Sequence, residues 1–262
     1  MSQPGWIEID GVANMRDVGG LPASDGRRVR PRRLIRSDNL QDLSRDAVRW
    51  LLEEAELSDV VDLRTGVEVR GEGPGPLTRT HVRIHNLSLY PEGADETGIP
   101  NDAEELPWLA ERGAIPGDTH EEVLVEHYLR YLRRRPDNVV AALRVISRAP
   151  GAVIVHCAAG KDRTGTITAL ALRLVGVGIG DIAADYDATN ERLSAVLARL
   201  RAKATYEADL AGQDEASQRT PAEAMQRLLT HVETRWGSVE NYLGRHGWTG
   251  DDTGALRARL LE

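Results

Sequence analysis

The sequence of 262 residues contains a single cysteine, Cys157. One cysteine cannot form a disulfide within the chain, which suits a reducing compartment and leaves the thiol free for chemistry. A signal peptide is not expected either, because residues 1–6 contain neither a basic stretch nor an apolar one. No apolar run approaches ~18 residues, so no membrane-spanning helix is expected. These absences predict a soluble, cytoplasmic protein.

An excess of positive charge is missing as well. The chain has 33 Lys and Arg residues against 41 Asp and Glu residues, a formal net charge of −8. This balance excludes the broad basic surface of a nucleic-acid-binding protein, so any anion site has to be local. Hydrophobic residues make up 41% and charged residues 28%, which is ordinary for a globular protein with a substantial core.

One stretch, residues 153–165, carries most of the chemical information. A β-branched run ends in His156 and Cys157, and five residues separate that cysteine from Arg163. Apolar residues then recur at helical spacing, which predicts a strand, a tight loop and a helix. Such a loop directs its backbone N–H groups into one concavity at a helix N-terminus, where a phosphate dianion fits and a thiolate is favoured. Arg163 adds a planar fork that can bind two phosphate oxygens.

The motif His-Cys-x5-Arg-Thr-Gly, with Gly160, Lys161 and Asp162 before the arginine, resembles the signature of the cysteine-dependent protein tyrosine phosphatases. It is most similar to the PtpB-like, triple-specificity bacterial branch. The resemblance implies an α/β fold, with a central and mostly parallel sheet flanked by helices, a helical C-terminal half and a helical lid. Residues 14–20 resemble that family's N-terminal motif, and we interpret them as a structural loop rather than a direct catalytic element.

The motif implies a role for each of its residues. Cys157 is the expected nucleophile, and Arg163 stabilises the transferring phosphoryl group together with the loop amides. Thr164 donates its hydroxyl to the thiolate. The phosphate-binding set comprises Ala158, Ala159, Gly160, Lys161, Asp162 and Arg163.

The general acid is less directly indicated, because the Trp-Pro-Asp sequence of many relatives is absent. Asp162 is the first candidate, Asp62 the second and Asp118 a distant third. No metal ion and no cofactor is expected to take part in the reaction.

Residues 60–64 form a second informative stretch, since an apolar strand ends there in Asp62 and Arg64. The carboxyl ends of strands carry the ligand crevice in open α/β sheets, so both side chains are candidates for the site. The alternative is an ion pair that ties down the strand end. As substrate-binding residues, Arg64 and Lys161 would contact additional negatively charged groups of a substrate. The expected substrates are phosphotyrosine, and with it phosphoserine, phosphothreonine and phosphoinositides; phosphate, sulfate or vanadate is expected to occupy the loop.

We expect a single domain over residues 1–262, with the strands before residue 160 and helices after it. Two segments, 91–135 and 195–235, exceed a minimal phosphatase core, and the second is the better candidate for a lid. Capping boxes are predicted at Thr119 and at Thr220, each with glutamate three residues later. Two other functions remain open: a catalytically silent phospho-ligand-binding module, and a rhodanese-like or redox cysteine protein.

Overall fold

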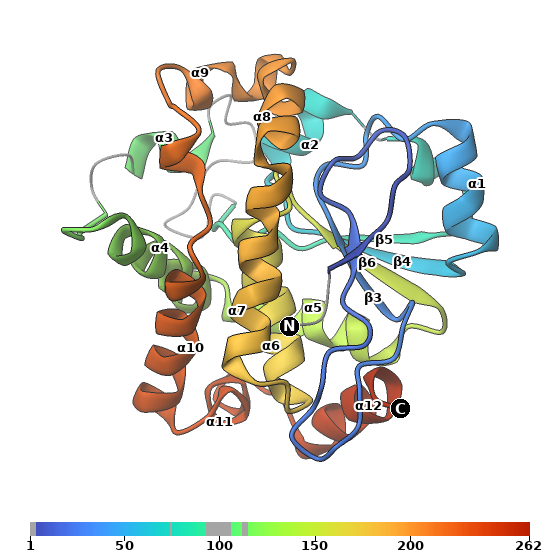
Figure 1. Ribbon diagram of the computed structural model, residues 1–262, viewed down its shortest axis with the longest axis vertical. Coiled ribbons are helices and arrows are strands. Elements are labelled where there is room, and N and C mark those ends of the chain that lie inside the picture. Colours follow the sequence, from blue (N-terminus) through green and yellow to red (C-terminus); the bar gives the residue numbers. More distant parts are fainter. Residues whose placement is uncertain (1–3, 74, 93–105, 112–114) are drawn as a thin grey trace.

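A six-stranded sheet forms the centre of the computed structural model, which describes residues 4–73, 75–92, 106–111 and 115–262 (Figure 1). The strand order is β1-β2-β3-β6-β4-β5. β3, β6, β4 and β5 are parallel, whereas β1 and β2 are two-residue strands that pair antiparallel at one edge. The expected mostly parallel sheet is confirmed. The strands are β1 (Gly5–Trp6), β2 (Arg16–Asp17), β3 (Leu34–Ser37), β4 (Leu57–Asp62), β5 (Arg83–Asn86) and β6 (Ala152–His156).

Helices cover both faces of the sheet, and most of those in the described residues follow the last strand, as expected. In Figure 1, α1 lies on one side of the sheet and α6, α7 and α10 on the other. The α-helices are α1 (Arg45–Glu53), α2 (Gly66–Glu72), α3 (Pro107–Glu111), α4 (His120–Arg134), α5 (Pro136–Arg148), α6 (Asp162–Leu174), α7 (Ile179–Asp187), α8 (Leu193–Arg201), α9 (Glu207–Leu210), α10 (Ala222–Trp236), α11 (Val239–Gly244) and α12 (Gly250–Leu260). Short 3₁₀ helices are η1 (Pro76–Arg79), η2 (Ala188–Arg192), η3 (Ala204–Tyr206) and η4 (Ala216–Gln218).

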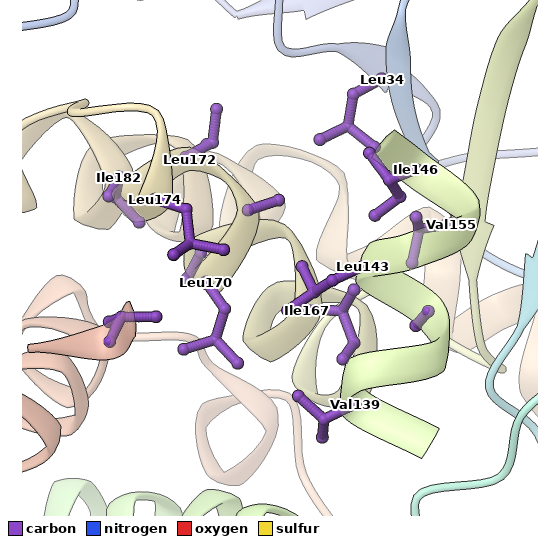
Figure 2. Close-up of a cluster of buried hydrophobic side chains, with 14 of the residues drawn as sticks. Leu34, Val139, Leu143, Ile146, Val155, Ile167, Leu170, Leu172, Leu174 and Ile182 are labelled. Atoms are coloured by element: carbon purple, nitrogen blue, oxygen red, sulfur yellow. The ribbon is translucent and has the colours of Figure 1, made fainter. Parts of the chain in front are cut away.

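The alternation of side chains along β6 divides the core into two clusters. Val153 and Val155 join a large cluster with α5, α6 and α7, shown in Figure 2, whereas Ile154 joins a smaller cluster with α1. Every residue of β6 is buried, as a parallel strand covered on both faces requires. In the large cluster, α6 is the central helix, with Ile167 against Leu143 of α5 (Figure 2).

The parallel strands end together at one edge of the sheet. Ser37, His156, Asp62 and Asn86 are the last residues of their strands and lie in register with one another. The loop after His156 therefore leaves the sheet between two neighbouring strand ends, at the edge where open α/β sheets bind their ligands. This register brings together residues from four separate parts of the chain.

The two predicted capping boxes have different outcomes. Thr119 accepts a hydrogen bond from the backbone N–H of Glu122, so its cap on α4 is confirmed, although the Glu122 carboxylate binds the N–H of Asp118 instead. The box at Thr220 is wrong, because the hydroxyl and N–H of Thr220 both donate to the side-chain oxygen of Asn190. α10 consequently begins at Ala222 with no side-chain cap.

Of the two additional segments, 195–235 contains most of α8, η3, α9, η4 and most of α10. α10 belongs to the main core, because Met225, Leu228 and Val232 are fully buried in it. In the segment 91–135, residues 93–105 and 112–114 lie outside the described residues. Within the described part of the chain, no helix is both long and apolar enough to span a membrane.

Two isoleucines on neighbouring strands test this packing. Ile154 and Ile84 both lie beside Val60, but Ile154 is fully buried whereas Ile84 is 39% exposed. We expect Ile154→Ala to lower the free energy of unfolding by about 2–5 kcal/mol, because it leaves a cavity, and Ile84→Ala to cost under about 1 kcal/mol. Urea unfolding followed by circular dichroism measures both values. Equal losses would contradict the burial of the central strand β6 relative to the edge strand β5.

Candidate active site

The loop between β6 and α6 surrounds the only cysteine. Cys157 is 2% exposed and lines a cavity of about 410 Å³. Gly160, in the middle of the loop, has a φ of +69°, and a Cβ there would lie 2.5 Å from the backbone of Ser37. Glycine is required at this position by both the backbone conformation and the contact.

The carbonyl groups of the loop are held from behind. Each of three successive carbonyls accepts a hydrogen bond from a donor outside the loop. The carbonyl of Ala158 binds the N–H of Asn39 (2.9 Å), that of Ala159 binds Nδ2 of Asn14 (3.0 Å), and that of Gly160 binds Nη2 of Arg36 (2.9 Å) and Nδ2 of Asn14 (3.2 Å).

The N–H groups of the same loop remain available. From Ala158 to Arg163, no backbone N–H donates to an acceptor within the described residues, and no side chain caps the N-terminus of α6. A loop whose carbonyls point away and whose N–H groups are unused is an anion-binding nest, and the helix dipole of α6 adds to its positive potential.

A buried ionic network supports the donors behind the loop. Nη1 of Arg16 donates to the side-chain oxygen of Asn14 (2.5 Å), and Asp185 of α7 pairs with both Arg16 (2.9 Å) and Arg36 (2.5 Å). Burial and the neighbouring Arg36 lower the pKa of Arg16 to about 10, despite the pull of Asp185. Residues 14–20, interpreted from the sequence as a structural loop, thus include Asn14, which binds two carbonyls of the loop between β6 and α6.

Arg163 is oriented by Glu68 of α2, a residue that the sequence analysis missed. Its Nη1 and Nη2 donate to the two carboxylate oxygens of Glu68 at 2.6 and 2.9 Å, and Nη1 also donates to the carbonyl of Leu63 (3.2 Å). These bonds leave Nε–H and the second Nη2–H, which lie on one edge of the guanidinium and can grip two oxygens. The available signal was Thr65 followed by Glu68, a capping box directly after a strand.

The fully buried Glu68 and an aromatic side chain both contact the guanidinium. Burial would lower the pKa of Arg163, but the carboxylate of Glu68 raises it well above its ordinary value. The Arg163 Cζ also lies 5.0 Å from the ring centroid of Trp108 in α3, a cation–π arrangement. Arg163 is therefore a fixed cation at the side of Cys157.

Asp62 and Arg64 pair with each other. Arg64 donates to both oxygens of Asp62 (2.9 and 2.7 Å), both side chains are buried, and neither lines the cavity as described. Burial raises the pKa of Asp62, but the neighbouring His156 and Arg64 lower it below its usual range. At neutral pH Asp62 has no proton to donate. The geometry is that of the alternative interpretation, an ion pair at the strand end.

The remaining predicted residues lie at or near the cavity. Asp162 and Lys161 line it, whereas the third acid candidate, Asp118, is exposed and does not. The Asp162 Oδ1 accepts a hydrogen bond from the Tyr128 hydroxyl (2.5 Å), and Lys161 Nζ donates to the carbonyl (2.8 Å) and side-chain oxygen (2.9 Å) of Gln218. The hydroxyl of Thr164 is buried and has no hydrogen-bond partner among the described residues.

The cavity widens from the loop into an aromatic and aliphatic chamber. Its walls come from α3, from α4 and from the segment between α8 and η4. The apolar and aromatic lining residues are Tyr90, Trp108, Ile115, Val123, Leu124, Tyr131, Leu200, Tyr206 and Leu210. A planar, apolar group attached to a phosphate in the loop would be in contact with these side chains.

His156, just before Cys157, makes stability depend on pH. Its Nδ1 lies 3.2 Å from the carbonyl of Cys157, and burial lowers its pKa from 6.5 to about 4. Between these values the unfolded chain binds a proton that the folded protein does not, so stability falls as the pH decreases. We expect a loss of about 2 kcal/mol between pH 7 and pH 5 from this residue.

Urea unfolding at the two pH values, on the wild type and on His156→Gln, measures this contribution. The variant should lose correspondingly less stability on acidification, whatever its stability at pH 7. The same pH dependence in both proteins would show that His156 is not the group responsible.

Comparison with known proteins agrees with this geometry. Residues 7–262 match the model of the tyrosine phosphatase family. The chain is 30% identical over 206 residues to the triple specificity protein phosphatase PtpB of Mycobacterium tuberculosis, covering 74% of this chain and 72% of that protein. It is also 30% identical over 241 residues to a putative tyrosine-protein phosphatase of Cupriavidus necator, covering 90% and 82% of the two chains. The chain therefore belongs to the tyrosine phosphatase family.

Proposed function

We propose that this phosphatase hydrolyses phosphotyrosine and related aryl phosphomonoesters through a phosphocysteine intermediate on Cys157. The observation that carries the proposal is the convergence of three features at one point. These are the unused N–H groups from Ala158 to Arg163, the free edge of the Arg163 guanidinium, and the sulfur of Cys157. A phosphoryl group bound there would have its equatorial oxygens solvated by fixed donors.

The reaction takes place in two steps. The Cys157 thiolate attacks phosphorus, and the bond from phosphorus to the leaving oxygen breaks as that oxygen receives a proton. Water then attacks the phosphocysteine, its proton passes to the same acid–base residue, and the P–S bond breaks to regenerate the thiolate. The buried hydroxyl of Thr164, which has no partner in the described structure, is available to stabilise the thiolate as it leaves.

Asp162 is the acid–base residue in this proposal. It lines the cavity beside Cys157, and its side chain is 26% exposed. One carboxylate oxygen is bound by Tyr128, and the other lies 3.9 Å from Lys161 Nζ. Asp62 is the weaker candidate, because Arg64 binds both of its oxygens.

The lining of the chamber supports an aryl substrate over one that carries several phosphates. Trp108, Tyr90 and Tyr131 offer aromatic faces and edges next to the loop. Lys161 and Arg64 are the cations that a phosphoinositide would require. Lys161 Nζ donates to Gln218, and Arg64, whose Nε and Nη2 donate to Asp62, does not line the cavity. Phosphoserine and phosphothreonine lack the ring that would fill this chamber.

Part of the segment 195–235 forms the lid in this proposal. Tyr206 and Leu210 line the cavity, and Gln218 contacts Lys161 of the loop. The preceding helix α8 is anchored, because Arg199 pairs with Asp38 and Lys203 pairs with Asp42. The movable part therefore begins after Lys203 and ends before α10, whose side chains belong to the core.

Cys157→Ser tests the reaction. We expect wild-type protein to hydrolyse p-nitrophenyl phosphate with EDTA present, and Cys157→Ser to lose at least about 10³-fold in kcat/KM because a serine hydroxyl is not ionised at neutral pH. Activity is measured by release of p-nitrophenolate.

A control measurement separates this outcome from misfolding. Circular dichroism and thermal unfolding of Cys157→Ser should match those of the wild type. Full activity in the variant would refute the nucleophile assignment. A folded wild type that binds vanadate without turnover would identify a phospho-ligand-binding module instead.

Hydrogen exchange tests the lid. With vanadate bound, backbone amides of residues 204–218 should exchange several-fold more slowly, because the anion fixes Lys161 and the segment that contacts it. α12, which packs on α5 in the core, serves as the internal control and should not change. Unchanged exchange in residues 204–218 would contradict a lid there.

A further inference from the structure

We propose that Tyr128 is a positioning residue, which holds the Asp162 carboxyl so that one chosen oxygen faces the substrate, and that Tyr186 supports it from behind. The inference rests on the proposed role of Asp162 as the general acid. It assigns a function to two fully buried tyrosines on α4 and α7 that contact no substrate in the proposed mechanism.

The geometry is a chain of two short hydrogen bonds. The Tyr128 hydroxyl is 2.5 Å from Oδ1 of Asp162, and the Tyr186 hydroxyl is 2.6 Å from that of Tyr128. Each phenol has one proton. Since Tyr128 donates its proton to the carboxylate, it must accept the proton of Tyr186, so the chain runs from Tyr186 through Tyr128 to Asp162.

This chain distinguishes the two oxygens of Asp162. Oδ1 is occupied by Tyr128, which leaves Oδ2 to exchange a proton with the leaving group or with water. Burial, and then the nearby Asp162 and Tyr186, raise the pKa of Tyr128 well above its ordinary value. A tyrosinate is therefore not formed, and the role of Tyr128 is orientation rather than proton relay.

The packing around Tyr186 supports a fixed arrangement. Gly165, the glycine of the signature motif, lies against the ring of Tyr186, and a Cβ there would be 2.9 Å from it. Glycine at this position allows α7 to approach α6 closely enough for the Tyr186 hydroxyl to reach Tyr128. Without Tyr128, the partly exposed Asp162 side chain could rotate about two torsions, and the proton would often be misdirected.

The test compares two similar substrates with different leaving groups, phenyl phosphate and p-nitrophenyl phosphate. Phenol is the poorer leaving group and depends on protonation. We expect Tyr128→Phe to lower kcat/KM for phenyl phosphate about tenfold and that for p-nitrophenyl phosphate about twofold or less. Asp162→Asn should show the same selectivity with a larger loss. Vanadate affinity should stay within about twofold in Tyr128→Phe.

A double-mutant cycle isolates the positioning role. In the Asp162→Asn background, Tyr128→Phe should cause no further loss, because there is no acid left to orient. Tyr186→Phe should give a smaller loss with the same selectivity. Tyr242→Phe is the matched control, since this buried phenol donates to the carbonyl of Leu132 (2.8 Å) away from the cavity, and it should leave both rates unchanged.

The outcomes separate the two claims. Equal losses on both substrates for Tyr128→Phe, or a further loss in the Asp162→Asn background, would overturn the positioning role while leaving Asp162 as the acid. If Asp162→Asn itself shows no selectivity, the acid assignment fails and the positioning role fails with it. Cys157-dependent turnover would still stand in that case.

Discussion

The site depends on the hydrogen bonds that hold the carbonyl groups of the loop between β6 and α6 on the side away from the cavity. A peptide group has its N–H and C=O on opposite sides, so fixing the carbonyls of Ala158, Ala159 and Gly160 behind the loop turns the N–H groups toward the cavity. Asn14 contributes most directly, because its one amide binds two of these carbonyls. In the proposed mechanism the backbone donors are thus in place before a substrate arrives, and little reorganisation is needed during the reaction.

The same principle of a buried partner that fixes a functional group recurs around the cavity. Glu68 selects the edge of Arg163 that faces the phosphate, and the Tyr206 hydroxyl, 3.3 Å away, contacts Glu68 in turn. Gln218 engages Lys161. Residues 206 and 218 are therefore connected, directly or through Glu68, to both Lys161 and Arg163, and a movement of the proposed lid would change the surroundings of both cations.

Local sequence patterns and the family resemblance made much of the fold and of the candidate site predictable. The loop from Cys157 to Arg163 follows from spacing alone, because the strand, the loop and the helix are contiguous in the sequence. The mostly parallel sheet was implied by the family resemblance. Glu68 had a local signal, the capping box with Thr65, but its pairing with Arg163 depends on how α2 packs against α6. The contact between Tyr128 and Asp162 likewise joins helices that are adjacent only in the folded protein. At Thr220 the local pattern was misleading. The predicted capping box does not form, because Thr220 bonds to Asn190, which is distant in the sequence, instead of to the N-terminus of α10.

The network of Arg16, Arg36 and Asp185 has a consequence for how activity arises during synthesis. The complete signature motif has been made once residue 165 has emerged, but Asp185, which holds both arginines, follows 20 residues later. Until Asp185 has been made, Arg16 and Arg36 lack the shared counter-ion that they have in the folded protein, so the donors behind the loop cannot be held as they are in the finished fold. The nascent chain therefore carries the sequence of the site before it carries every residue that organises it.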